Sequence, residues 1–140
     1  MDNRRRVLIV DDDEMVCRVV ERVLGRDYVV RVAARGEEAL GLLTDGERFD
    51  LILTDFAMPR MDGAQLIELI GQLDRAQADR VIFITANALS AMVETSALHA
   101  IVDKPFSPRK LRELVDRVTA ANEDGYFPTR DDDLPVPGNT

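Results

Sequence analysis

Short, fully apolar runs recur along the chain and alternate with segments whose apolar residues are spaced three or four apart. The short runs are rich in β-branched residues and are bounded by acids, glycines or prolines, a pattern typical of strands buried on both faces. Five strands are expected on this basis: Val7–Val10, Tyr28–Val32, Leu51–Thr54, Val81–Ile84 and Ala100–Val102.

The segments between and after these runs have the periodicity of helices with one buried face. The first is expected to have Asp13 as its N-cap and to end at Gly25, with Val16, Val19, Val20, Val23 and Leu24 on its apolar side. The others are expected at Glu37–Leu43, Ala64–Leu73 and Ser90–Ser96, and after the N-cap Ser107 and Pro108, with Leu111, Leu114, Val115 and Val118 buried.

Five apolar strands that alternate with five helices indicate an α/β protein with a parallel sheet covered on both faces. Right-handed crossovers leave few topologies for such a chain. We therefore predict the flavodoxin-like (βα)5 sandwich, a doubly wound five-stranded sheet of order 2-1-3-4-5.

The last part of the chain differs in composition from the rest. Residues 122–140 hold three prolines, two glycines, five acids and one arginine, and they show no apolar periodicity. A segment with so little hydrophobic material does not offset its ordering entropy by burial. We predict one domain over residues 1–121 and a disordered acidic tail or linker over 122–140.

Charge and cysteine content exclude several classes of protein. A net charge of −8 argues against direct nucleic-acid binding by the bulk surface. The single cysteine, Cys17, excludes an intramolecular disulfide and a cysteine zinc site. No signal peptide is visible and no apolar run approaches membrane-spanning length, so no membrane insertion is expected and the cytoplasm is the expected compartment.

Polar residues follow four of the expected strands. Asp11, Asp12, Asp55, Thr85 and Lys104 all stand at carboxyl ends, which meet at one edge of a parallel sheet. Each alone has an ordinary explanation as a helix cap or surface residue. Together, the three carboxylates repel one another and call for a hard cation such as Mg²⁺. With the ammonium and the hydroxyl they would surround a phosphoryl group, and a carboxylate is itself able to accept one.

Four motifs follow one another along the chain: Val7–Glu14, Asp55–Pro59 with Met61–Gly63, Ile84–Ala86, and Lys104–Phe106. In these motifs the chain resembles the response-regulator receiver domains of two-component signalling, and the resemblance covers about residues 5–120. The resemblance implies that Asp55 accepts a phosphoryl group from a phosphohistidine on a histidine kinase or histidine phosphotransfer protein. It also implies a conformational change that signals, and it allows for a receiver dimer.

The resemblance further implies a role for each site residue. Asp12, Asp55 and the backbone carbonyl of Ala57 would bind Mg²⁺ directly, and Asp11 would act through water. Thr85 and Lys104 would hold the phosphoryl oxygens. Receiver domains usually have a cis peptide bond before the corresponding proline, so Lys104–Pro105 is expected to be cis.

One region departs from the family pattern. Ile101 stands where receivers commonly have a tyrosine or phenylalanine, and the usual Gly-Ala element is replaced by Ala97–Ala100. The segment from Thr85 to Lys104 is short by about one helical turn. Shortening of this kind resembles the C-terminal receivers of hybrid sensor kinases. Without the aromatic ring, signalling is not expected to use a side-chain rotamer switch.

Two other functions compete with the phosphoacceptor. A haloacid-dehalogenase-like phosphatase would use Asp11 and Asp13, but it needs a second acidic pair on a later strand and leaves Asp55 unexplained. A receiver-like adaptor that is never phosphorylated would usually have lost an acid or the lysine, and this chain keeps all five positions. The expected function is therefore that of a phosphoacceptor signalling domain and not of an enzyme with a separate substrate.

Overall fold

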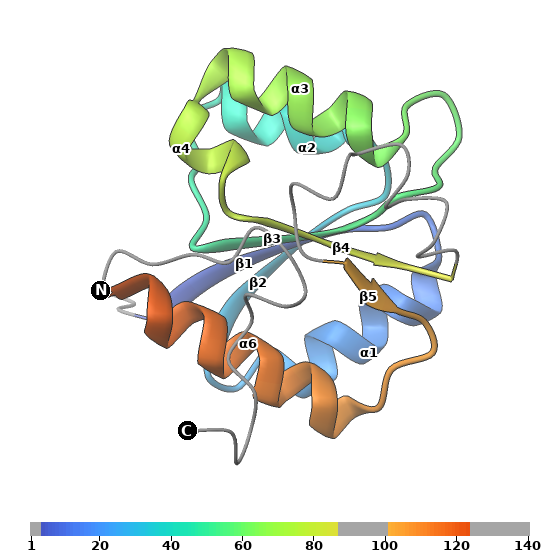
Figure 1. The fold of residues 1–140 in the computed structure, drawn as a ribbon, viewed down its shortest axis with the longest axis vertical. Coiled ribbons are helices and arrows are strands. Elements are labelled where there is room, and N and C mark those ends of the chain that lie inside the picture. Colours follow the sequence, from blue (N-terminus) through green and yellow to red (C-terminus); the bar gives the residue numbers. More distant parts are fainter. Residues whose placement is uncertain (1–3, 87–100, 124–140) are drawn as a thin grey trace.

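The computed structural model describes residues 4–86 and 101–123. Its five strands are all parallel and lie in the order β2-β1-β3-β4-β5, as predicted (Figure 1). The strands are β1 (Arg5–Val10), β2 (Tyr28–Ala33), β3 (Leu51–Asp55), β4 (Val81–Thr85) and β5 (Ile101–Asp103). The helices are α1 (Glu14–Leu24), α2 (Gly36–Thr44), α3 (Gly63–Leu73), α4 (Arg75–Ala78) and α6 (Pro108–Glu123).

Helices cover both faces of the sheet, which gives the doubly wound sandwich that the alternating pattern predicts. Figure 1 shows α2, α3 and α4 on one side and α1 and α6 on the other. Alternate strand residues feed the two cores, so Ile9 and Leu53 pack toward α1 and α6, whereas Leu8 and Ile52 pack toward α2 and α3. Because both faces are buried, β3 and β4 are buried at every position.

Most expected elements match the structure to within one or two residues. Asp13 caps α1, with its side chain accepting a hydrogen bond from the N–H of Met15 at 2.9 Å. Leu73, expected on the apolar stripe of α3, is instead 46% exposed at the end of that helix. The helix expected at Ser90–Ser96 lies outside the described residues, as do Ala100 and residues 124–140.

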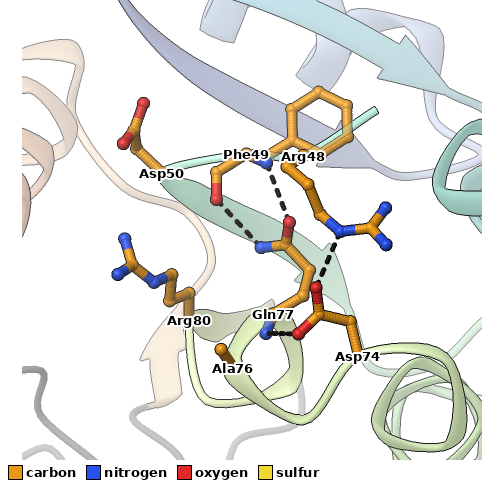
Figure 2. Close-up of a pocket in the computed structure, with 7 residues that line it drawn as sticks. All are labelled: Arg48, Phe49, Asp50, Asp74, Ala76, Gln77 and Arg80. Carbon is orange, nitrogen blue, oxygen red and sulfur yellow. Dashed lines mark hydrogen bonds and ion pairs between the residues drawn. The ribbon is translucent and has the colours of Figure 1, made fainter. Parts of the chain in front are cut away.

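The short helix α4 was not predicted, and it forms a corner at the edge where the strands begin. Asp74 ends α3, caps α4 and accepts a hydrogen bond from Nε of Arg48 at 2.7 Å. The side chain of Gln77 then accepts from the N–H of Phe49 at 2.8 Å and donates to its carbonyl at 2.9 Å (Figure 2). Gln77 thus acts as a partner for backbone that precedes β3, on the edge away from the predicted site.

Candidate phosphoacceptor site

Asp11 is held rigidly at the end of β1. Its backbone N–H donates to the carbonyl of Ala33 at 3.1 Å, which continues the pairing with β2 for one residue. Its Oδ1 accepts from the N–H of Asp13 at 2.9 Å, and the residue is only 1% exposed. The carboxylate is therefore fixed with Oδ2 turned to Lys104, while Asp12 beside it is exposed.

Asp55 is the last residue of β3, the central strand. The register pairs it with Ile84 of β4, and it is 8% exposed. Its Oδ1 lies 3.4 Å from the N–H of Ala57, the next exposed residue in the loop. Its Oδ2 is left toward Lys104.

Lys104 forms ion pairs with the carboxylates of both Asp11 and Asp55. Its Nζ lies 2.8 Å from Oδ2 of Asp11 and 3.4 Å from Oδ2 of Asp55. Its backbone N–H donates to the carbonyl of Thr85 at 2.9 Å, so the ends of β4 and β5 are aligned. The peptide bond to Pro105 is cis, as expected. Residues from the ends of four strands thus meet at the carboxyl edge of one sheet.

Three acids lie close enough together to share a cation. One ligand oxygen each from Asp11, Asp12 and Asp55 can be chosen so that all lie within 4.8 Å of one another. A set of carboxylates without histidine or cysteine suits hard cations such as Mg²⁺. The donor set of the described residues therefore fits the ion that the resemblance implies.

The charges of the site are strongly coupled. Burial raises the pKa of Asp55, the negative charge of Asp11 raises it further, and Lys104 opposes both effects. Burial lowers the pKa of Lys104, but the hydrogen bond and the charge of Asp11, followed by Asp55, outweigh burial and raise it overall. Lys104 therefore stays a cation, and the ionised form of Asp55 is disfavoured by its surroundings.

The loop after Asp55 is closed on itself. The N–H of Gly63 donates to the carbonyl of Phe56 at 2.7 Å, and Asp62 caps α3 in a reciprocal pair with Gln65. Arg60 takes a positive φ of 69° within the turn. Phe56 packs inward beside Ile101, which is 4% exposed, so the position that is aromatic in many receivers holds a buried aliphatic side chain here.

An apolar hollow of about 400 Å³ adjoins the site. It lies between α1 and the segment that follows β5, and Lys104 forms part of its wall. Its other lining residues are Met15, Val16, Val19, Ala86, Pro105 and Phe106. Met15 is 67% exposed, so a large apolar side chain faces solvent beside the charged site.

Comparison with known proteins agrees with this geometry. Residues 7–116 match the response regulator receiver domain, and the chain belongs to that family. It is 36% identical over 112 residues to the two-component response regulator ORR24 of Oryza sativa, covering 78% of this chain but only 17% of that protein. It is 30% identical over 119 residues to a CheY homologue, a chemotaxis protein of Campylobacter jejuni, covering 81% of this chain and 91% of the relative.

Solved structures give the same fold. The receiver domain of the sensor histidine kinase PA1611 from Pseudomonas aeruginosa matches with a TM-score of 0.72 and 27% identity, over 84% of this chain and 98% of that one. That structure has a magnesium ion coordinated in its active-site cleft. The chemotaxis protein CheY4 of Vibrio cholerae matches with a TM-score of 0.71 and 30% identity, over 82% and 98% of the two chains.

Sequence reasoning did not single out two features of the site. Met15 lies beside the apolar stripe of α1 and is exposed. The one clue to this in the sequence is that a large apolar residue follows a run of acids. Phe83 was predicted only as a strand residue, although its ring lies against Phe56 and the start of α3.

Within the described part of the chain, no helix is long and apolar enough to cross a membrane.

Proposed function

We propose that this domain takes a phosphoryl group from a phosphohistidine onto Asp55 and changes conformation in response. The observation that carries the proposal is the geometry of Lys104, whose Nζ lies within 3.4 Å of carboxylate oxygens of both Asp11 and Asp55. Lys104 lies between two buried carboxylates and supplies a fixed positive charge. We infer that a phosphoryl group binds there together with a second cation.

The transfer is a simple displacement at phosphorus. A carboxylate oxygen of Asp55 forms the bond to phosphorus as the bond to the imidazole nitrogen of the donor breaks. That nitrogen keeps the bonding electron pair and takes a proton from solvent. Lys104 then balances the charge of the phosphoryl oxygens, and Thr85, on the adjacent strand end, offers its hydroxyl to them.

Asp11, Asp12, Asp55 and the carbonyl of Ala57 are the groups we propose for Mg²⁺. When bound, the ion supplies positive charge that offsets the repulsion between the carboxylates and the incoming phosphoryl group. The chain's own contribution is to hold these oxygens together: the Asp13 N–H fixes Asp11, and the Ala57 N–H fixes Asp55.

The apolar hollow beside Lys104 is the surface that we propose for the phosphohistidine-bearing partner. It is continuous with the site and presents Met15 outward. Met15→Asp is expected to slow transfer from a phosphohistidine donor protein by roughly tenfold or more, since a buried charge replaces an apolar contact. Labelling by acetyl phosphate, which needs no protein contact, should stay unchanged, and so should both rates for Leu73→Asp, a remote exposed control. Equal slowing from both donors would contradict this surface.

The test of the function itself is phosphoryl uptake. The protein is incubated with acetyl phosphate and Mg²⁺, and intact mass is followed with and without EDTA. We expect one phosphoryl group per chain, lost in EDTA and absent in Asp55→Asn, while Glu68→Gln on the exposed side of α3 is labelled like the parent. Labelled Asp55→Asn would overturn the assignment.

Three further measurements separate the competing functions: phosphate release, labelling by a phosphohistidine donor, and binding of beryllofluoride. Continuous release of inorganic phosphate with many turnovers per chain would indicate a phosphatase. No labelling by acetyl phosphate or by a phosphohistidine donor, together with no binding of beryllofluoride in the presence of Mg²⁺, would indicate an adaptor that is never phosphorylated.

A further inference from the structure

The ring of Phe83 occupies the space that a side chain at Gly63, the first residue of α3, would need. A Cβ added to Gly63 would overlap Cε1 of Phe83, and it would lie 3.0 Å from Cδ1 of the same ring and 3.1 Å from Cα of Phe56. Carbon atoms pack at about 3.5–4.0 Å. The ring and the helix start are therefore closer than any residue other than glycine would allow.

The same ring also touches the other end of the loop. Phe56 and Phe83 meet edge to face, with their centroids 5.3 Å apart and their planes at 81°. Phe83 is completely buried, and Phe56 is 6% exposed. Because the Gly63 N–H donates to the Phe56 carbonyl at 2.7 Å, the loop is closed between two residues that both rest on one ring.

Ala57 lies directly after Phe56 in this loop. Its N–H faces Oδ1 of Asp55 at 3.4 Å, and its carbonyl is one of the groups proposed above for the metal. A shift of Gly63 away from Phe56 would open the loop and move the backbone of Ala57 relative to the carboxylate. The backbone of Ala57 is thus linked through this loop to residues that contact the Phe83 ring.

We propose that Phe83 is a positioning residue for this site: its ring, seated on Gly63 and against Phe56, holds the backbone of Ala57 beside Asp55. The inference rests on the proposed function only for the identity of what Ala57 binds. Phe83 makes no contact with reacting atoms in this proposal, and its effect passes through the loop.

Gly63→Ala is the direct test, and Gly71→Ala is its matched control. Both positions lie in α3, but a Cβ added to Gly71 would lie 3.7 Å from Cβ of Ala78, an ordinary contact. Gly63→Ala is expected to weaken Mg²⁺ binding by roughly tenfold or more, measured from the chemical shift of the Ala57 amide. It is also expected to slow acetyl phosphate labelling by roughly tenfold or more. Gly71→Ala should leave both at the parent values.

A second substitution distinguishes positioning from general damage. Phe83→Leu makes room for the new methyl group, so the pair Gly63→Ala and Phe83→Leu should recover most of the lost Mg²⁺ affinity and labelling rate. The pair Gly71→Ala and Phe83→Leu should show no such coupling. Metal-free amide exchange at Gly63 and Ala57 should be faster in Gly63→Ala and slow again in the compensated pair.

Each outcome decides the matter. Gly63→Ala with the Mg²⁺ affinity and amide exchange of Gly71→Ala would overturn the proposal, as would failure of Phe83→Leu to compensate. If Gly63→Ala does not fold, Phe83→Leu alone must still speed exchange at Gly63 and weaken Mg²⁺ binding. If the parent chain is never labelled, the proposed function fails, and the amide exchange still decides the positioning role.

Discussion

At the scale of single residues, the site holds more negative than positive charge. Two buried carboxylates share one ammonium, with Lys104 closer to Asp11 than to Asp55. The cost falls on Asp55, whose pKa is raised by burial and by the charge of Asp11. A folded domain tolerates such a cost where the strained group has a task, and the task that we propose for Asp55 is to accept a phosphoryl group.

Removing that charge should therefore stabilise the metal-free domain. Asp55→Asn is expected to raise Tm in EDTA at neutral pH, because the amide keeps the shape without the buried charge. Since the pKa is raised in the folded state, the folded parent binds the proton more readily than the unfolded chain, whose value is near 3.8. The gain in stability of Asp55→Asn over the parent is thus greatest above the pKa that Asp55 has in the folded state. It shrinks as pH falls toward 3.8.

Differential scanning calorimetry over this pH range checks the prediction, with Glu68→Gln as the control for losing a surface charge. A lower Tm for Asp55→Asn at neutral pH would mean that the attraction of Lys104 outweighs burial and the repulsion of Asp11.

At the scale of elements, the corner formed by α3 and α4 secures the start of the central strand. Gln77 is 3% exposed and satisfies both backbone groups of Phe49, while Arg48 reaches across to Asp74 (Figure 2). Phe49 is itself a core residue on the α2 and α3 side. A helix of four residues has little stability of its own, so α4 is maintained by these contacts.

Gln77→Ala should destabilise the fold without changing the chemistry. It leaves a buried N–H and a buried carbonyl without their partner, which costs about 2 kcal/mol of unfolding free energy. Urea unfolding measures this cost, and Gln72→Ala, on an exposed position of α3, should be nearly neutral. Acetyl phosphate labelling of the folded variant should match the parent, because the corner lies at the opposite edge of the sheet from Asp55. Slower labelling would show that the two edges are coupled.

At the scale of the whole molecule, one compact unit extends from β1 to α6. Arg5 at the start of β1 donates to Thr119 near the end of α6 at 3.4 Å, and Tyr28 of β2 bonds Asp116 and Thr119 of the same helix. The last helix runs to Glu123, past the expected domain boundary at Ala121. The composition of the residues beyond it, acidic and rich in proline and glycine, still predicts a tail that adds nothing to the core.

Truncation after Glu123 should therefore leave the fold intact. We expect Tm to change by less than about 5 °C, the shift that corresponds to roughly 1 kcal/mol in a domain of this size. Circular dichroism of the full chain and of the truncated chain gives the comparison, and truncation within α6 after Val115 should unfold the domain as a positive control. A larger drop for the first truncation would show that the tail packs on the domain.

The sequence by itself determined the strands, the order of the sheet and the edge of the sheet at which Asp11, Asp55 and Lys104 meet. Apolar runs such as Val7–Val10 must be buried on both faces, and parallel strands bring their carboxyl ends to one edge. Asp11, Asp55 and Lys104 could therefore be placed together before any distance was known. These inferences depend on local composition and on topology, both of which are written along the chain.

Tertiary structure alone decided the rest, because the rest depends on contacts between residues far apart in sequence. Which carboxylate Lys104 approaches more closely follows from packing at the ends of three strands. The corner at Gln77 exists because Phe49 needs backbone partners. The fit of Phe83 over Gly63 is a matter of tenths of an ångström between two elements, a scale that no periodicity along the chain encodes.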